Sequence, residues 1–246
     1  MKKYLVVGAS SGIGKALTLK LLVGGNKVWG VARREKPIIN AGQNFFYTAM
    51  DINIKDSWKK LSRSLKARKY FPDVVIMCAA VYGTDLPFQI DLATTRKIME
   101  TNFFAILEGV NVLLPLFKKG SQVIVISSIS SQKGSGQEGI GYPASKAAIS
   151  IAFESLQQKY QSKILFKTVF LGPVRTGMSP FTKHTFLSIS EDKTVSIILR
   201  AINSNNIFIY SPHILFFILR CAKLFSQKIY FKLLNVIDLQ HKQSLS

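Results

Sequence analysis

Short apolar runs alternate along the chain with longer stretches in which apolar positions recur at helical spacing. The runs predict strands at residues 4–7, 27–32, 74–79, 122–127 and 163–171. The longer stretches predict helices at residues 14–23, 54–67, 93–117, 142–160 and 191–202. This alternation is typical of an α/β fold with a parallel sheet between two layers of helices. Right-handed crossovers make such a sheet doubly wound, so we expect ligands at the carboxyl ends of its strands.

A turn rich in glycine joins the first predicted strand to the first predicted helix. Its sequence is Gly8-Ala9-Ser10-Ser11-Gly12-Ile13-Gly14. Glycine allows backbone angles that other residues avoid, and it lets a pyrophosphate approach the chain closely. The start of the following helix adds free N–H groups and a partial positive charge. A plain strand-to-helix turn rarely needs three glycines in this arrangement, so the segment predicts a nucleotide-binding loop.

Two arginines, Arg33 and Arg34, follow the second predicted strand. An acidic side chain here would bind the free ribose 2′-hydroxyl of NAD, whereas guanidinium groups suit a 2′-phosphate. Lys15 would add a third positive charge, and the acidic Glu35 comes only after the strand end. Two solvated arginines in a basic chain are the alternative. The pattern favours NADP(H) over NAD(H).

Tyr142 and Lys146 stand four positions apart in the segment Tyr-Pro-Ala-Ser-Lys. On a helix these positions share one face, one turn apart. A nearby ammonium group favours the phenolate, so we expect the pKa of Tyr142 to fall below its usual value of about 10. Such a phenol can pass a proton to a carbonyl oxygen or take one from an alcohol. Together with the glycine loop, this pair predicts an enzyme that moves a hydride.

These motifs, in this order, resemble the short-chain dehydrogenase/reductase family over nearly all of residues 1–200. The resemblance implies a Rossmann-type fold, hydride exchange between a nicotinamide cofactor and a carbonyl or secondary alcohol, and a homodimer or homotetramer. The residues that it places against the cofactor are Gly8, Ser10, Ser11, Gly12, Ile13, Gly14, Arg33, Arg34, Asp51, Ile52, Ala79, Ala80, Tyr142, Lys146, Pro173, Val174 and Thr176.

The same resemblance implies four catalytic roles. Tyr142 is expected to be the acid/base, and Ser128 a second hydroxyl donor to the substrate oxygen. Two such donors can hold the negative charge that develops on that oxygen during hydride transfer. Lys146 would lower the pKa of the phenol and hold the ribose hydroxyls, and Asn102 would connect it to solvent through a water molecule. For Asn102 alone, local capping or packing is the ordinary alternative.

The chain departs from the family pattern at three places. Residues 77–80 read Met-Cys-Ala-Ala where the family usually has Asn-Asn-Ala-Gly, which changes local hydrogen bonding beside the cofactor more than the chemistry. Leu171 stands where proline is usual. The loop from Ser128 to Tyr142 is one residue longer than usual, so Ser127 and Ser130 remain alternatives for the catalytic serine.

Composition sets further bounds. The length of 246 residues suits one α/β domain, and an apolar content of 48% excludes global disorder. Lysine and arginine number 33 against 13 acidic residues, a net charge of +20 that attracts anions unless the lysines only cover solvated faces. Two cysteines, Cys78 and Cys221, form no disulfide framework and favour a reducing, cytoplasmic compartment. The three histidines lack metal-ligand spacing, so we assign no metal.

The C-terminal part is apolar and basic. We expect a catalytic domain over residues 1–200 and an extension over residues 201–246 packed on it, with a lid over an apolar ligand near residues 178–187. Residues 207–246 contain apolar runs with basic residues between them, which fits helices at an anionic membrane surface and a break near Ser226. A core or dimer-interface helix pair, or a cover over the substrate pocket, are the alternatives. No transmembrane helix is visible.

The sequence therefore predicts an NADP(H)-dependent oxidoreductase acting on a small carbonyl or alcohol, with an apolar or lipid-like substrate. We expect it in the cytoplasm, peripheral to the inner face of a membrane. The alternatives are a catalytically silent nucleotide sensor or a membrane-associated scaffold of the same fold. Nucleic-acid binding is suggested by charge only, and we exclude it because no recognition motif accompanies that charge.

Overall fold

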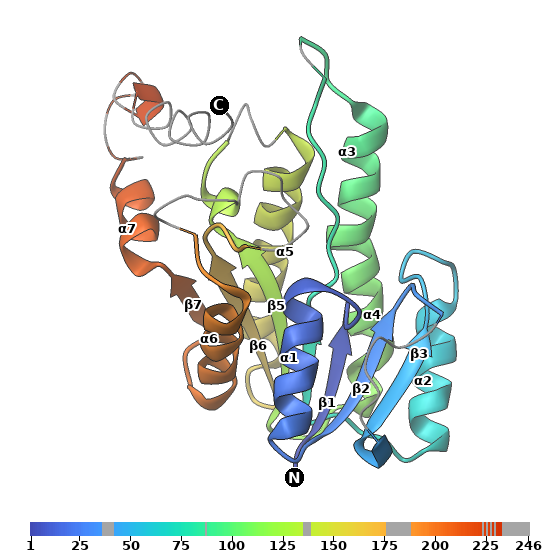
Figure 1. Cartoon of the computed structure of the whole chain (residues 1–246). Helices are drawn as coiled ribbons and strands as arrows, with labels where there is room; N and C mark the ends of the chain where they lie inside the picture. Colours follow the sequence, from blue (N-terminus) through green and yellow to red (C-terminus); the bar gives the residue numbers. More distant parts are fainter. Residues whose placement is uncertain are drawn as a thin grey trace.

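A seven-stranded parallel sheet forms the centre of the protein (Figure 1). A computed structural model describes residues 1–35, 42–86, 88–134, 139–175 and 188–222, with positions 224, 226, 228 and 230–232. The strands are β1 (Lys3–Val7), β2 (Lys27–Ala32), β3 (Phe45–Ala49), β4 (Val74–Met77), β5 (Ser121–Ser128), β6 (Ile164–Leu171) and β7 (Phe208–Ser211). They follow the order β3-β2-β1-β4-β5-β6-β7, so the order of strand addition reverses beside β1, where β4 pairs on the side opposite β2. The predicted doubly wound α/β fold is confirmed, and ligands of such sheets bind at this reversal.

Helices cover both faces of the sheet (Figure 1). They are α1 (Gly12–Val23), α2 (Ser57–Ala67), α3 (Leu92–Met99), α4 (Ala105–Leu113), α5 (Gly141–Tyr160), α6 (Glu191–Asn203) and α7 (His213–Ala222). Side chains of α2, α4 and α5 pack on one face, and those of α1 and α6 pack on the other. Strand residues are buried on both faces because alternate side chains point to opposite helix layers, which explains the continuous apolar runs in the sequence.

Two strands were not predicted from the sequence. β3 is short and its side chains are only half-buried, so its pattern gives a weak signal. β7 lies inside the apolar stretch that the sequence reading assigned to the C-terminal tail. It pairs in parallel with β6, from Thr168 opposite Phe208 to Leu171 opposite Ser211. The sheet therefore extends into the predicted 201–246 extension.

α7 closes the far end of the sheet beside β7. Leu215, Phe216 and Leu219 are buried against Phe170 of β6. The Phe170 ring also stacks on Tyr210 of β7, with ring centroids 4.9 Å apart. One face of α7 is thus part of the core, and burial of several large side chains is worth several kcal/mol, at about 2 kcal/mol each.

The predicted helix over residues 93–117 is not continuous. α3 ends at Met99 and passes into a π-helical turn, η2 (Glu100–Phe104), before α4 begins; a 3-10 turn, η3 (Leu114–Leu116), follows α4. A π turn inserts an extra residue and changes the direction in which its side chains point, and it occurs often at functional sites. Asn102 lies on this turn.

Candidate active site

The glycine loop is folded tightly against the end of β4. Gly8 has a φ of +91° and Gly12 a φ of +48°, values that favour glycine. A Cβ atom at Gly8 would lie 2.7 Å from the backbone nitrogen of Ala79, and one at Gly14 would lie 2.1 Å from the Gly8 carbonyl oxygen. The Ser11 side chain makes no capping hydrogen bond to α1. The loop therefore needs glycine at these positions and presents the start of α1 to an anion, which fits a pyrophosphate.

Arg34 lies across this loop. Its Nη1 donates to the Ser10 carbonyl oxygen over 3.0 Å and to Ser10 Oγ over 2.7 Å. The Tyr47 hydroxyl from β3 donates to the Arg34 carbonyl oxygen over 2.7 Å and fixes the backbone there. Arg33 is exposed beside it. A guanidinium held at the phosphate loop suits a 2′-phosphate.

Asp51 and Ile52 follow β3 at the same edge of the sheet. Asp51 accepts a hydrogen bond from the backbone nitrogen of Asn53 over 2.9 Å, and the Ile52 side chain is buried. The Asn53 side-chain amide donates to Thr101 on the π turn over 3.1 Å. The segment is therefore fixed beside the helix that carries Asn102.

Asn102 holds the chain where it leaves β4. Its side chain is fully buried, and its Oδ1 accepts from the Val81 backbone nitrogen over 2.8 Å. Its Nδ2 donates to the Val81 carbonyl oxygen over 2.9 Å and to Ser145 Oγ of α5 over 3.1 Å. Ala79 and Ala80, just before Val81, are half-buried. Asn102 thus joins three elements, and its amide is committed to backbone and side-chain partners.

Tyr142 and Lys146 meet on the first turns of α5. The ammonium nitrogen of Lys146 lies 5.6 Å from the centre of the Tyr142 ring and donates to the Ile126 carbonyl oxygen over 2.9 Å. Lys146 is only 3% exposed, and burial lowers the pKa of its ammonium group to about 8. Burial also raises the pKa of the neighbouring Cys78 thiol to about 12, although Lys146 opposes this rise. At neutral pH the lysine is therefore still charged beside the phenol.

The three candidate serines occupy different surroundings at the end of β5. Ser127 is buried, and its Oγ lies 2.8 Å from Ser150 Oγ of α5. Ser128 is half-buried; its Oγ accepts from the Ser130 backbone nitrogen over 3.1 Å and donates to Ser130 Oγ over 3.0 Å. Ser130 is buried. Ser127 is thus engaged in the β5–α5 contact, while Ser128 lies at the strand end with the greatest exposure of the three.

Pro173 and Val174 lie just after β6. The Ile189 backbone nitrogen donates to the Pro173 carbonyl oxygen over 3.0 Å, and the Arg175 nitrogen donates to the Ile189 oxygen over 3.0 Å. The predicted cofactor residue Thr176 and the predicted lid at residues 178–187 lie outside the described residues. The described chain stops at Arg175 and resumes at Ser188. The structure therefore places both ends of this segment at the carboxyl edge of the sheet.

The family model for short chain dehydrogenases matches residues 2–185 of the chain. The chain belongs to the short-chain dehydrogenase/reductase family. As a member of this family it is an oxidoreductase, and the observed sheet with its glycine loop is the fold that the family shares with solved structures. The motif resemblance in the sequence is thereby confirmed for the family.

Several known proteins are similar to this short-chain dehydrogenase/reductase. An uncharacterized oxidoreductase from Saccharomyces cerevisiae is 31% identical over 156 residues, 60% of this chain and 61% of that protein. The NADPH-dependent pterin aldehyde reductase of Arabidopsis thaliana is 23% identical over 196 residues, 77% of this chain and 78% of that protein. A 3-ketodihydrosphingosine reductase of Bacteroides thetaiotaomicron is 31% identical over 157 residues, 62% of this chain and 56% of that protein. The matched part thus spans about three fifths of the yeast protein.

A solved structure has the same fold. The short chain dehydrogenase of Burkholderia cenocepacia, crystallised in complex with NADP, superposes with a TM-score of 0.82 at 22% identity. The superposition covers 94% of this chain and 97% of that one. At this identity the comparison supports the fold.

Tyr82 was not predicted from the sequence as a site residue. Its ring packs edge-on against Tyr142, with ring centroids 5.1 Å apart and planes at 70°. Tyr82 follows Val81, whose backbone Asn102 holds at both polar atoms. The only sequence signal was an aromatic residue two positions after the Met-Cys-Ala-Ala segment, and no local pattern links it to a residue sixty positions later.

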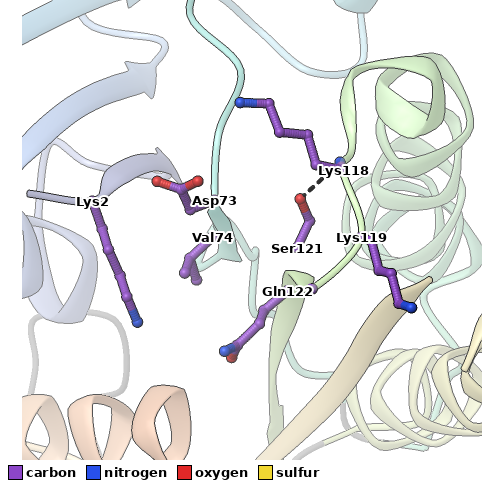
Figure 2. A pocket seen from close by; sticks show the side chains of 8 residues that line it. Lys2, Asp73, Val74, Lys118, Lys119, Ser121 and Gln122 are labelled. Atoms are coloured by element: carbon purple, nitrogen blue, oxygen red, sulfur yellow. Dashed lines mark hydrogen bonds between the residues drawn. The ribbon is translucent and has the colours of Figure 1, made fainter. Parts of the chain in front are cut away.

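A hollow of about 290 Å³ lies at the opposite, amino edge of the sheet (Figure 2). Figure 2 shows Lys2, Lys118 and Lys119 around it, together with Asp73. None of the candidate residues lines this hollow, so it is separate from the active site. Among the described residues, no three His, Cys, Asp or Glu side chains gather in a way that could hold a metal ion.

Proposed function

We propose that this short-chain dehydrogenase/reductase interconverts a carbonyl group and a secondary alcohol with NADP(H), with Tyr142 as the acid/base. The observation that carries the proposal is the buried Lys146 ammonium group 5.6 Å from the Tyr142 ring. A cation at that place stabilises the phenolate, and the glycine loop supports cofactor binding at the same edge of the sheet. A nucleotide sensor without turnover is less favoured because Ser128, Tyr142 and Lys146 are all present.

Each residue has a defined task in this proposal. When bound, the nicotinamide supplies the hydride for carbonyl reduction or accepts it from an alcohol. Tyr142 donates its proton to the carbonyl oxygen, and Ser128 donates a hydrogen bond to the same oxygen. Lys146 holds positive charge close to the phenol. Asn102 acts as a positioning residue by fixing Val81, and a water relay from Lys146 through Asn102 stays a prediction.

Substitution of Tyr142 by Phe tests the chemistry. We expect Tyr142→Phe to bind NADPH with wild-type affinity and to lose activity by about 100-fold or more, because the ring packing stays while the proton donor is removed. Tyr160→Phe, at the other end of α5, is the matched control and should keep full activity. Wild-type activity in Tyr142→Phe would disprove the assignment.

The preference for NADP(H) is supported by Arg34 at the phosphate loop. We expect Arg34→Ala to weaken NADPH binding by about 10- to 100-fold and to leave NADH binding within about twofold, because only the 2′-phosphate needs the guanidinium. Arg63→Ala on the exposed face of α2 removes the same charge far from the loop and is the control. Fluorescence titration measures the affinity of wild type and of both variants for NADPH and for NADH. Tighter wild-type binding of NADH than of NADPH would overturn the preference.

We further propose an apolar substrate presented at an anionic membrane surface by residues 207–246. In support, α7 buries one face and exposes apolar side chains on the other: Ile214 and Phe217 are each 67% exposed. Arg220 lies over the Phe216 ring at 5.1 Å, next to this exposed face. In the part of the chain that the structure describes, no helix is long and apolar enough to cross a bilayer. Interfacial binding needs only such an amphipathic face.

Co-sedimentation with vesicles tests the membrane proposal. We expect binding to phosphatidylcholine vesicles that contain phosphatidylglycerol, and weaker binding of Phe217→Ser. A screen of carbonyl compounds of increasing chain length tests the substrate class, and higher kcat/KM for long chains is expected. Light scattering after gel filtration tests the predicted homodimer or homotetramer. Absence of vesicle binding would remove the membrane proposal and leave the reductase proposal intact.

A further inference from the structure

The loop between β4 and α3 ends in a tight turn with a fully exposed aromatic tip. The Gln89 backbone nitrogen donates to the Leu86 carbonyl oxygen over 3.2 Å and closes the turn. Phe88 at the tip has a φ of +58° and a relative exposure of 111%. A left-handed backbone is unusual for a large side chain, and such conformations persist mainly where the surrounding structure imposes them. Folding of the isolated chain gains nothing from exposing this ring.

The base of this turn is fixed by one carboxylate. Asp85 Oδ1 accepts from the Asp91 backbone nitrogen over 3.1 Å, and Oδ2 accepts from the Ile140 backbone nitrogen over 2.9 Å. Asp91 in turn caps α3 by accepting from the Thr94 nitrogen over 2.9 Å. Both acidic groups are thus committed to backbone N–H donors. Because Ile140 lies two residues before Tyr142, the turn is attached directly to the start of the catalytic helix.

The exposed apolar residues of this loop alternate along the chain. Leu86 is 56% exposed, Phe88 111%, Ile90 54% and Leu92 60%, and the adjoining Ile140 is 50% exposed. We call the four exposed residues Leu86, Phe88, Ile90 and Leu92 the rim loop. Scattered single apolar residues on a surface are ordinary, but these four with the adjoining Ile140 form a candidate interaction site.

The rim loop and α7 project from the same edge of the molecule. Figure 1 shows the chain before α3 rising beyond the carboxyl ends of the strands, with α7 at the same end of the sheet. This edge also carries the glycine loop, Ser128 and Tyr142. The two apolar surfaces therefore stand on either side of the region where a substrate would enter.

The charge of the chain indicates what covers these surfaces. The net charge is +20, so an anionic bilayer attracts the chain. We propose that the rim loop inserts into the interface of an anionic bilayer and, together with α7, turns the active-site edge toward the membrane. An apolar carbonyl substrate would then reach Tyr142 from the bilayer without crossing water. This inference rests on the proposed membrane association. It adds the rim loop as a second membrane contact beside α7, and it orients the active-site edge toward the bilayer.

Substitution of Phe88 tests the inference. Phe88→Gly removes the ring and places the residue best suited to a positive φ at the tip, so the fold should be retained. We expect it to weaken binding to vesicles of phosphatidylcholine with phosphatidylglycerol by about tenfold, since one large apolar side chain no longer enters the interface. Val23→Gly is the control: Val23 is 84% exposed at the end of α1, on the amino side of the sheet.

A fluorescent reporter checks the orientation directly. The two native tryptophans, Trp29 and Trp58, are buried, so a Phe88→Trp variant adds a signal that responds to the tip environment. We expect its added emission to shift to shorter wavelength with anionic vesicles and to stay unchanged with phosphatidylcholine alone. The rim-loop proposal is wrong if wild-type protein binds vesicles and two further results are obtained. In these, the added tryptophan of Phe88→Trp keeps the emission wavelength of a water-exposed indole, and Phe88→Gly binds vesicles as tightly as wild type.

Two further measurements distinguish failure of the membrane proposal from failure of the reductase proposal. If Phe88→Gly abolishes self-association in sedimentation velocity without changing vesicle binding, the occupant is a second copy and the membrane orientation is overturned. NADPH titration and activity toward a water-soluble carbonyl are measured on the same preparations. If these succeed while no vesicle binding occurs, the membrane orientation fails and the proposed reductase function stands; if they fail while vesicles bind, the reverse holds.

Discussion

Removal of the Lys146 charge is expected to stabilise the fold while it abolishes activity. Lys146 has a folded-state pKa of about 8, lowered from 10.5 by burial. This fall corresponds to about 3 kcal/mol of destabilisation while the ammonium group is charged in both states, at about 1.4 kcal/mol per pH unit. In Lys146→Met this penalty disappears, but the Ile126 carbonyl oxygen loses its donor at 2.9 Å, which costs about 1 kcal/mol. The expected net gain below pH 8 is about 2 kcal/mol.

The sign of the pH dependence makes this prediction specific. Between pH 8 and 10.5 the Lys146 side chain is protonated in the unfolded chain but not in the folded protein. Its contribution to the free energy of unfolding of the wild type therefore rises with pH in this window. The advantage of Lys146→Met should therefore shrink through that window and reverse to a loss of about 1 kcal/mol above it. Urea unfolding without cofactor at several pH values measures the difference. Lys66→Met on the exposed face of α2 should show none of this dependence. A difference between wild type and Lys146→Met that stays constant from pH 7 to 10.5 would refute the reasoning.

Three other outcomes follow from the site. The value of kcat/KM for carbonyl reduction should fall as pH rises above about 8, because Lys146 then loses the charge that stabilises the phenolate; a pH–rate profile checks this. Gly14→Ala should lose NADPH binding and about 1–3 kcal/mol of stability, because its methyl group would lie 2.1 Å from the Gly8 carbonyl oxygen; titration and urea unfolding measure both, and unchanged binding would contradict the close packing. Tyr82→Ala should lower kcat by about tenfold with NADPH affinity unchanged, because the catalytic phenol loses the ring that orients it, whereas Tyr82→Phe should keep full activity.

The sequence predicted the fold class because its signals are local. Five of the seven strands and the glycine loop follow from runs of apolar residues and from glycine spacing, which depend on neighbours along the chain. β3 and β7 were missed since short strands at the edges of the sheet bury little and carry weak patterns. The π turn at Asn102 was not predicted either, because a single inserted residue leaves the helical periodicity of the sequence almost unchanged.

The candidate site was predictable only as a set of residue types. The sequence pairs Tyr142 with Lys146 through helical spacing, but the lysine pKa is lowered by burial beside β5, where the Ile126 carbonyl oxygen accepts its hydrogen bond. The contact of Arg34 with Ser10 likewise joins residues that are apart in sequence. Tyr82 was missed for the same reason. Tertiary contacts decide which side chains work together, and no single-sequence pattern records them.

The position of β7 makes the last part of the chain necessary for folding. During synthesis β6 emerges with an open edge and with Phe170 uncovered, and both stay so until residues 208–211 and α7 have left the ribosome. A nascent chain that pauses before this point exposes an unpaired strand edge that can pair with another chain. Deletion from residue 207 onward would therefore cause aggregation whatever the role of the tail, while deletions that begin after Ala222 leave the sheet complete.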